Sequence, residues 1–231
     1  MLEYAREIFA DTEINIGTEG ERHLGAAIGS PEFKEIYVRK KVENWVRDTE
    51  QLAEIAKDEP QIAFSAFTKA LCMRWCFVQR TVSGISHLFQ PLEDCIRETM
   101  IPAIVGRRVS DIERRIMALP VRLGGIGILN PVETADIEYQ TSIEITADLK
   151  NIIYNQEETL ENYDEDRVKI SINKTKQSKD KRLNAEFELV KTLVDDGMKS
   201  NLDLAREKGS GSWLTALPIQ ALGYVLNNSR S

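Results

Sequence analysis

The chain has 231 residues, of which 42% are hydrophobic and 29% charged, so it can bury a real core and is not disordered as a whole. Its formal net charge of −7 argues against a surface that coats nucleic acid everywhere. Three cysteines, an odd number, argue against a disulfide framework, and no apolar run reaches membrane-spanning length, so we expect an intracellular protein of the nucleus or cytoplasm without a membrane partner.

The first thirty residues predict a short helix followed by a β-hairpin. Residues 3–10 have the pattern of the end of a helix, and residues 14–16 alternate as a short strand. Turn residues fill positions 17–20, and residues 22–28 are predicted to return as the second strand. Because a two-stranded hairpin alone is barely stable in water, we expect it to pack on a neighbouring element.

The next 125 residues predict a bundle of five helices, so the expected fold class is mainly α. Four starts are marked by capping residues or prolines: Ser30 with Pro31, Pro60, Ser110, and Asn130 with Pro131. The predicted helices cover residues 31–58, 60 to the Ser83-Gly84 break, 85–105 with interruptions near Pro91 and Pro102, 111–118 and 131–154. The stripe expected to face the core on the first comprises Phe33, Ile36, Tyr37, Val42, Trp45, Val46, Leu52 and Ile55. The second is apolar on most sides, which is typical of a central, buried helix.

A glycine-rich turn follows the fourth helix, in the stretch Leu119-Pro120-Val121-Arg122-Leu123-Gly124-Gly125-Ile126-Gly127-Ile128. Its three glycines stand between apolar residues, and glycine permits positive φ and close backbone approach, so a tight, buried structural turn is predicted at Gly124, Gly125 and Gly127. The alternative is a phosphate-binding loop. That loop spaces its glycines differently and follows a strand rather than a helix, so we favour the structural turn.

The C-terminal third changes in composition. Residues 156–182 are polar and charged, as in a solvated linker or an exposed helix, and residues 184–208 regain helical spacing. A flexible Gly-Ser break at 209–212 precedes an apolar segment at 213–219. The predicted organisation is therefore a helix and hairpin (1–29), a helical bundle (30–155) and a linker with a helical extension (156–231).

Positive charge is concentrated in the middle of the chain. Residues 61–130 carry nine basic and five acidic side chains, and six arginines fall within 26 positions: Arg97, Arg107, Arg108, Arg114, Arg115 and Arg122. The i, i+7 spacing of 107 with 114 and of 108 with 115 could place these four on one helix face that meets phosphates. The alternative is local pairing, because Asp111 lies at helical spacing from Arg114 and Arg115.

Catalytic and metal-binding patterns are weak. Cys72 and Cys76 stand four apart on an apolar helix, where packing is favoured over a zinc site. The acidic run at 163–166 lies in the polar stretch. Asp195-Asp196 is similar to the paired aspartates of polymerases, but it follows helical spacing, so the end of a helix is favoured. We expect no catalytic residue, no metal site and no cofactor in this chain.

Three stretches, in order, resemble the C-terminal part of reverse transcriptases from non-LTR-type retrotransposons. They are Arg22-His23-Leu24-Gly25-Ala26-Ala27-Ile28-Gly29, the pair Pro91-Leu92-Glu93 and Ile101-Pro102-Ala103-Ile104, and the glycine-rich turn with the residues before it. The segment 213–219 is similar to one downstream of that domain in such transposable-element proteins. The resemblance spans nearly the whole chain and rests on the order and spacing of the motifs.

The resemblance implies part of an RNA-directed DNA polymerase. The hairpin at His23, Leu24 and Gly25 would end the palm, which grips the primer strand, and the helices after Ser30 would form the thumb along the template–primer duplex. The fingers and the palm aspartates that bind Mg²⁺ in this family would precede Met1. We therefore expect a fragment, a degenerate copy or a mispredicted exon that is inert alone and that would have the missing fingers and palm as its partner.

Two hypotheses remain at this point. The first is a thumb module that binds an RNA–DNA or DNA duplex weakly through His23, Leu24, Gly25, Arg107, Arg108, Arg114, Arg115 and Arg122. The second is a helical protein-interaction or scaffold module that does not bind nucleic acid. The arginines and the resemblance favour the first, and the net charge of −7 favours the second.

Overall fold

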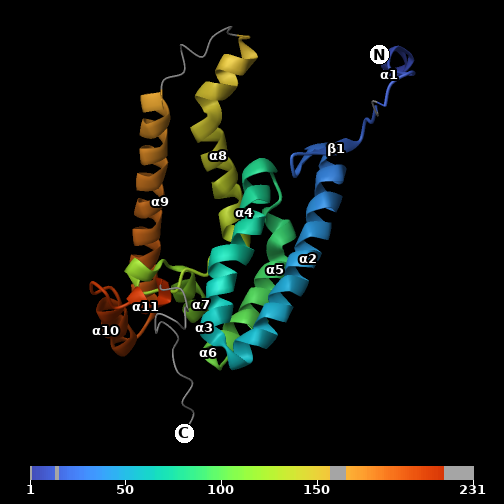
Figure 1. Ribbon diagram of the computed structural model, residues 1–231. Helices are drawn as coiled ribbons and strands as arrows, with labels where there is room; N and C mark the ends of the chain where they lie inside the picture. Colours follow the sequence, from blue (N-terminus) through green and yellow to red (C-terminus); the bar gives the residue numbers. More distant parts are fainter. Residues whose placement is uncertain (1, 14–15, 157–164, 216–231) are drawn as a thin grey trace, which may run out of the picture.

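The computed structural model describes residues 2–13, 16–156 and 165–215 (Figure 1). It is mainly helical with an antiparallel two-stranded hairpin near the N-terminus, which confirms the expected fold class. Figure 1 shows the helices of the bundle side by side, with α2 at one edge and α8 and α9 toward the other. None of the described helices combines the length and apolar composition that a membrane crossing requires.

The bundle is built on the long helix α2 (Pro31–Asp58). It starts where the sequence predicts, because the Ser30 hydroxyl accepts a hydrogen bond from the Phe33 amide at 3.2 Å and a proline follows the cap. The residues of α2 that are fully buried are Val38, Val42, Trp45, Thr49, Ala53 and Ala56. The predicted stripe was therefore wrong at Ile36 and Ile55, which are exposed. The small residues Ala53 and Ala56 let the helices approach closely where a larger side chain was expected.

Two further helical runs complete the bundle core. The first joins α3 (Pro60–Ala66), the π-helical η1 (Phe67–Leu71) and α4 (Cys72–Thr81). The second joins η2 (Ser86–Phe89), α5 (Gln90–Cys95), the π-helical η3 (Ile96–Met100) and α6 (Ile101–Val105). Both runs were predicted, but the π segments were not. The second π segment ends at Met100, two residues before Pro102, which has no amide hydrogen to donate to the preceding turn.

Aromatic side chains fill the centre of this core. Trp45 of α2 stacks on Phe89 with ring centroids 6.1 Å apart, and Trp75 of α4 lies 6.1 Å from Trp45 and 5.8 Å from Phe67. These distances are typical of favourable aromatic pairs. The apolar second helix thus contributes Phe67 and Trp75 to the centre, but the prediction that it is buried on most sides was wrong at Ile62, Met73 and Phe77, which are exposed.

The hairpin exists, but its predicted strands were wrong. Its strands are β1 (Gly20–His23) and β2 (Ala26–Gly29), paired from Gly20↔Gly29 to His23↔Ala26. The turn is Leu24-Gly25, within the segment predicted as one strand, and positions 14–15 lie outside the described residues. Both turn residues have positive φ, 48° and 87°, as in the tight turns that match strand twist. Gly20 begins the ladder, and at this position the Phe33 ring leaves no room for a side chain.

The hairpin packs on the bundle, as its marginal intrinsic stability requires. Ala27 is 3% exposed and belongs to the main core. The Tyr37 hydroxyl of α2 donates a hydrogen bond to the Gly25 carbonyl at 2.6 Å, which ties the turn to the bundle. Before the hairpin, α1 (Leu2–Ile8) matches the predicted helix end.

The remaining helices are α7 (Asp111–Ala118), α8 (Pro131–Tyr154), α9 (Glu165–Leu193), α10 (Asp196–Ala205) and α11 (Ser212–Thr215). α7 and α8 pack on the bundle, α8 against α4, whereas α9 and the helices after it form an arm beside it. The polar stretch was predicted to be either a solvated linker or an exposed helix. Its described part, from residue 165 onward, belongs to one continuous helix. A second, smaller core joins the arm to the glycine turn through Leu119, Leu123, Phe187, Val190 and Leu202. Of the apolar segment at 213–219, residues 216–219 lie outside the described part.

The glycine turn has the geometry that the sequence predicts. Gly124 and Gly127 adopt left-handed φ values of 80° and 73°. At Gly125 a Cβ would overlap the carbonyl oxygen of Leu119 and would lie 2.5 Å from that of Ile116. The three glycines are therefore required for two different reasons: conformation at 124 and 127, and space at 125.

We predict that Gly125→Ala destabilises the protein by about 3 kcal/mol or more, because the added methyl group forces two backbone segments apart. Gly127→Ala is the matched control, since open space surrounds its Cβ position and only the left-handed backbone is penalised, by about 1 kcal/mol. Denaturant unfolding followed by circular dichroism measures both. Equal unfolding midpoints for the two variants would contradict the close approach at Gly125.

Candidate nucleic-acid interface

Arg114 is a buried structural residue and not a surface cation. Its guanidinium donates to both carboxylate oxygens of Glu93 at 2.7 Å, and the two side chains are only 6% and 7% exposed. It also donates to the carbonyl oxygens of Ile128 at 2.7 Å and Leu129 at 3.3 Å. Burial raises the pKa of the Glu93 carboxyl, and the hydrogen bonds from Arg114 oppose that rise. Arg114 was therefore wrongly included among the predicted nucleic-acid contacts.

Arg107 and Arg108 do not share a helix face with the later arginines. They lie between α6 and α7, because Gly106 ends α6 in a left-handed conformation and Ser110 begins α7. The Arg107 guanidinium pairs with Glu113 at 2.5 Å and, with the Ser110 amide, lowers the pKa of that carboxyl to about 2. Arg108 is exposed and its side chain makes no ion pair or hydrogen bond within the described residues.

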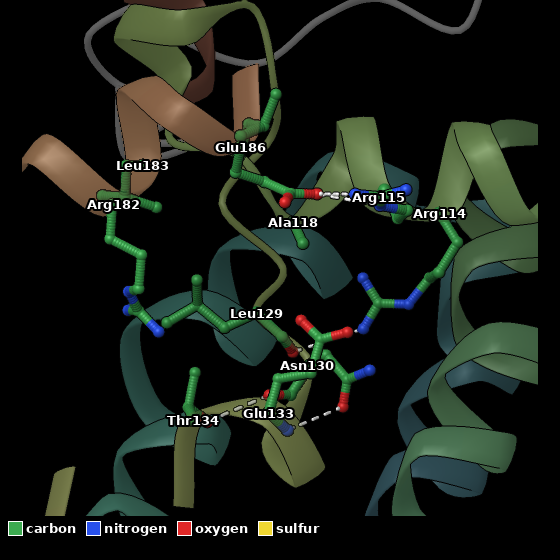
Figure 2. A pocket seen from close by; sticks show the side chains of 11 residues that line it. Arg114, Arg115, Ala118, Leu129, Asn130, Glu133, Thr134, Arg182, Leu183 and Glu186 are labelled. Carbon is green, nitrogen blue, oxygen red and sulfur yellow. Dashed lines mark hydrogen bonds and ion pairs between the residues drawn. The ribbon is translucent and has the colours of Figure 1, made fainter. Parts of the chain in front are cut away.

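Arg115 and Arg122 tie the bundle to α9. Arg115 pairs with Glu186 at 2.8 Å, as Figure 2 shows, and Arg122 pairs with Asp180 at 2.6 Å. Asp111, the partner expected for Arg114 or Arg115, instead pairs with Arg97. The arginines therefore do not form a shared phosphate-facing surface. They pair within the chain, but the predicted local pairing of Asp111 with Arg114 or Arg115 was wrong, because most of the partners are distant in sequence.

The cavity between α7, α8 and α9 has mixed charge. It has a volume of about 130 Å³, and Figure 2 shows Arg115, Arg182, Glu133 and Glu186 around it. Asn130 lines it as well, with its side chain engaged in capping α8 through the amides of Val132 and Glu133. Cations and carboxylates alternate along its wall, so the cavity has no strong preference for an anion.

The hairpin turn, in contrast, lies open to solvent. Leu24 is 86% exposed, His23 is exposed, and Gly25 is held by Tyr37. Next to the turn is a groove of about 390 Å³, here called the hairpin groove. Its lining residues are Leu24, Gly25, Tyr37, Lys41, Asn44, Trp45, Asp48, Arg74, Phe77 and Val78.

The hairpin groove combines cations with exposed aromatic and apolar edges. The Lys41 ammonium lies 5.7 Å above the Tyr37 ring, and Lys41 has no carboxylate partner within the described residues. Arg74 pairs with Asp48 across the groove, between α4 and α2. Phe77 is 45% exposed beside the hairpin turn. Cations that meet phosphates and rings that meet sugars or bases are the two components of sequence-independent nucleic-acid binding.

Sequence reasoning missed Lys41, Arg74 and Phe77. A signal existed for the first, since residues 39–41 are three consecutive basic side chains. Phe77 was assigned to the core because its helix is apolar on most sides. Only the packing of the hairpin against α2 and α4 shows that these three side chains and the turn meet.

No catalytic centre is visible in the part of the chain that the structure describes. No three His, Cys, Asp or Glu side chains there gather in a way that could hold a metal ion. Asp195 caps α10 by accepting from the Met198 amide at 2.8 Å, so the Asp195-Asp196 pair begins a helix rather than ending one. Comparisons with protein-family models, with curated proteins and with solved structures find no match to the chain.

We predict that Arg114→Met destabilises the protein by about 3–5 kcal/mol, because it leaves the Glu93 carboxylate buried without its counter-charge. Adding Glu93→Leu is expected to restore part of the loss, since no buried charge then remains. The recovery is incomplete because the carbonyls of Ile128 and Leu129 still lack their donor. Unfolding free energies of the two single variants and the double variant measure the effect. A double variant whose loss equals the sum of the single losses would show that the pair is not coupled.

We predict slow alkylation of all three cysteines in the folded protein at pH 7. Burial raises the pKa of the Cys72 and Cys95 thiols to about 11 and also raises the pKa of Cys76. Since only the thiolate reacts, modification of Cys72 and Cys95 by iodoacetamide should be about a hundredfold slower than for a free thiol. Cys76 should also be slowed, and all three rates should increase as the pH rises. Mass spectrometry against the denatured protein measures the rates. Modification of one cysteine at the denatured rate would identify a reactive thiol that the burial does not explain.

Proposed function

We propose that the chain is the thumb-like part of an RNA-directed DNA polymerase and contacts a template–primer duplex without catalysing synthesis. The observation that carries the proposal is the hairpin groove. There Lys41, Arg74 and Phe77 meet the exposed turn at Leu24-Gly25, the position at which the resemblance to reverse transcriptases implies contact with the primer strand.

The order of the elements supports the proposal. A hairpin is followed directly by a long helix and a bundle, as the resemblance implies for the end of a palm and a thumb. The hairpin is held against the bundle by Tyr37 and by the buried Ala27, so the turn is presented at a constant position. A constant position suits a contact along a regular backbone.

The chemistry of the hairpin groove favours recognition of the sugar–phosphate backbone over recognition of bases. Lys41 supplies a point charge, and the Asn44 amide group faces the same groove. Phe77 and Leu24 offer apolar surface to sugars at its rim. Contacts of this kind hold a duplex in register but do not read its sequence.

A second candidate is supported by the pairing of the arginines. Arg107, Arg114 and Arg115 are each neutralised by a carboxylate of the chain, and the net charge is −7. A helical scaffold that does not bind nucleic acid accounts for both facts. The two candidates differ in one measurable property, which is binding that weakens as salt rises.

We predict that the protein binds a fluorescein-labelled RNA–DNA hybrid at low salt and that Lys40→Glu/Lys41→Glu weakens binding about tenfold, equivalent to about 1.4 kcal/mol. The two lysines are adjacent on α2, and Lys41 lines the hairpin groove. Fluorescence anisotropy at roughly 50 and 200 mM salt measures affinity and salt dependence. The slope of log affinity against log salt should fall by about one for each phosphate contact removed.

Lys57→Glu/Lys150→Glu is the matched control, because it changes the net charge equally at exposed positions on α2 and α8 away from the groove. Equal weakening by the control would assign the effect to net charge alone. No binding by the parent at low salt would leave the scaffold as the better account.

A further inference from the structure

The described part of α9 contains the densest positive charge of the chain. Between residues 166 and 182 there are seven basic and two acidic side chains. The C-terminal third is acidic as a whole, but most of its carboxylates lie outside residues 166–182. The net charge of the third therefore does not reveal the basic segment. The structure makes the segment one continuous helix, so its lysines are displayed along a rigid rod.

Both carboxylates of this segment are already paired. Asp166 pairs with Lys169 at 3.1 Å, and Asp180 pairs with Arg122 of the bundle at 2.6 Å. Glu186, the next acidic residue along α9, is taken by Arg115. Two acidic side chains of α9, Asp180 and Glu186, are thus bound by arginines from outside the helix and are not available to its lysines.

Four cations in nine residues remain without a partner. Lys174, Lys176, Lys181 and Arg182 are exposed, and within the described residues their side chains make no ion pair or hydrogen bond. Lys179 alone among the cations at 174–182 is paired, with Glu138 of α8 at 3.6 Å. Lys174 and Lys181, which lie on one side of the helix, are called the α9 basic face; Lys176 and Arg182 line the cleft against α8.

The spacing of the face matches a phosphate backbone. Lys174 and Lys181 are seven residues apart and therefore lie on the same side of the helix, about 10.5 Å apart along its axis. Successive phosphates of one strand are separated by about 3.4 Å along a duplex, so the two lysines span about three nucleotides. The exposed amides of Asn173 and Gln177 lie between or beside them and can donate to phosphate oxygens.

A membrane surface is a poorer occupant than a nucleic acid. A helix that lies on a bilayer needs a free apolar face to insert. The apolar side chains Phe187 and Val190 of α9 are buried in the second core, and Ile172 lines the cleft against α8. What remains free around 174–182 is charge and amide groups.

We propose that the α9 basic face is a second docking surface for a nucleic-acid backbone, distinct from the hairpin groove. The inference rests on the proposed function in one respect, which is that the ligand of both surfaces is a nucleic acid. It adds a contact on the arm, at an element to which neither the sequence patterns nor the resemblance assigned a role.

The test uses the full chain and the labelled RNA–DNA hybrid in anisotropy titrations at low salt. Lys174→Glu/Lys181→Glu is expected to weaken binding by at least fivefold and to reduce the salt slope by about two. Lys57→Glu/Lys150→Glu again serves as the control of equal charge change, and circular dichroism verifies that each variant keeps its helix content. A second probe, vesicles containing phosphatidylserine, tests a membrane as the ligand.

The outcomes separate this inference from the proposed function. If only the α9 variant binds the hybrid more weakly, the α9 basic face is supported and the hairpin groove is excluded as a binding surface. If only Lys40→Glu/Lys41→Glu binds more weakly, the hairpin groove is supported and the α9 basic face is excluded. Independent weakening by both supports two surfaces. Parent-like binding by the α9 variant, or binding to vesicles but not to the hybrid, overturns the inference.

Discussion

The bidentate ion pair between Arg114 and Glu93 is the interaction on which the arrangement of α5, α7 and the glycine turn depends. It joins two helices in the interior and, through its remaining donors, satisfies the carbonyls of Ile128 and Leu129. Those carbonyls belong to the irregular segment that leaves the turn, and that of Ile128, which is 1% exposed, would otherwise be buried without a partner. The Arg114 side chain thus supplies the hydrogen bonds that this non-helical stretch of backbone needs in the interior. The glycine turn, held in this way, positions the start of α8.

The other arginines act as connectors between parts of the molecule. Arg97 and Arg107 hold the start of α7, whereas Arg115 and Arg122 reach across to α9. A positive segment of sequence has therefore become a set of internal bridges. The carboxylates of Asp180 and Glu186, which Arg122 and Arg115 bind, are therefore not available to the lysines of α9.

Local signals in the sequence predicted most element boundaries. Ser30, Ser110 and Asn130 cap the helices that they were expected to cap, since a cap is decided by the residue and its next three amides. The hairpin turn at Leu24 could not be predicted in this way. A leucine with positive φ goes against local preference, and the pairing of Gly20 with Gly29 depends on how the hairpin meets Phe33 of α2. The spacing of Arg107 and Arg108 with Arg114 and Arg115 suggested a common helix face. The structure rules this face out, because the helix ends at Gly106 and a new one begins after Ser110.

The attachment of α9 differs in kind from that of the bundle helices. Its contacts to the turn region are the small second core around Leu119 and Phe187 and two partly exposed ion pairs, whereas α2 is embedded in the main core. Exposed ion pairs are screened by salt, and small clusters contribute little to global stability. We therefore expect the arm to open at a lower free energy than the bundle. Since rising ionic strength weakens exposed ion pairs, we expect the attachment of α9 to loosen as salt increases.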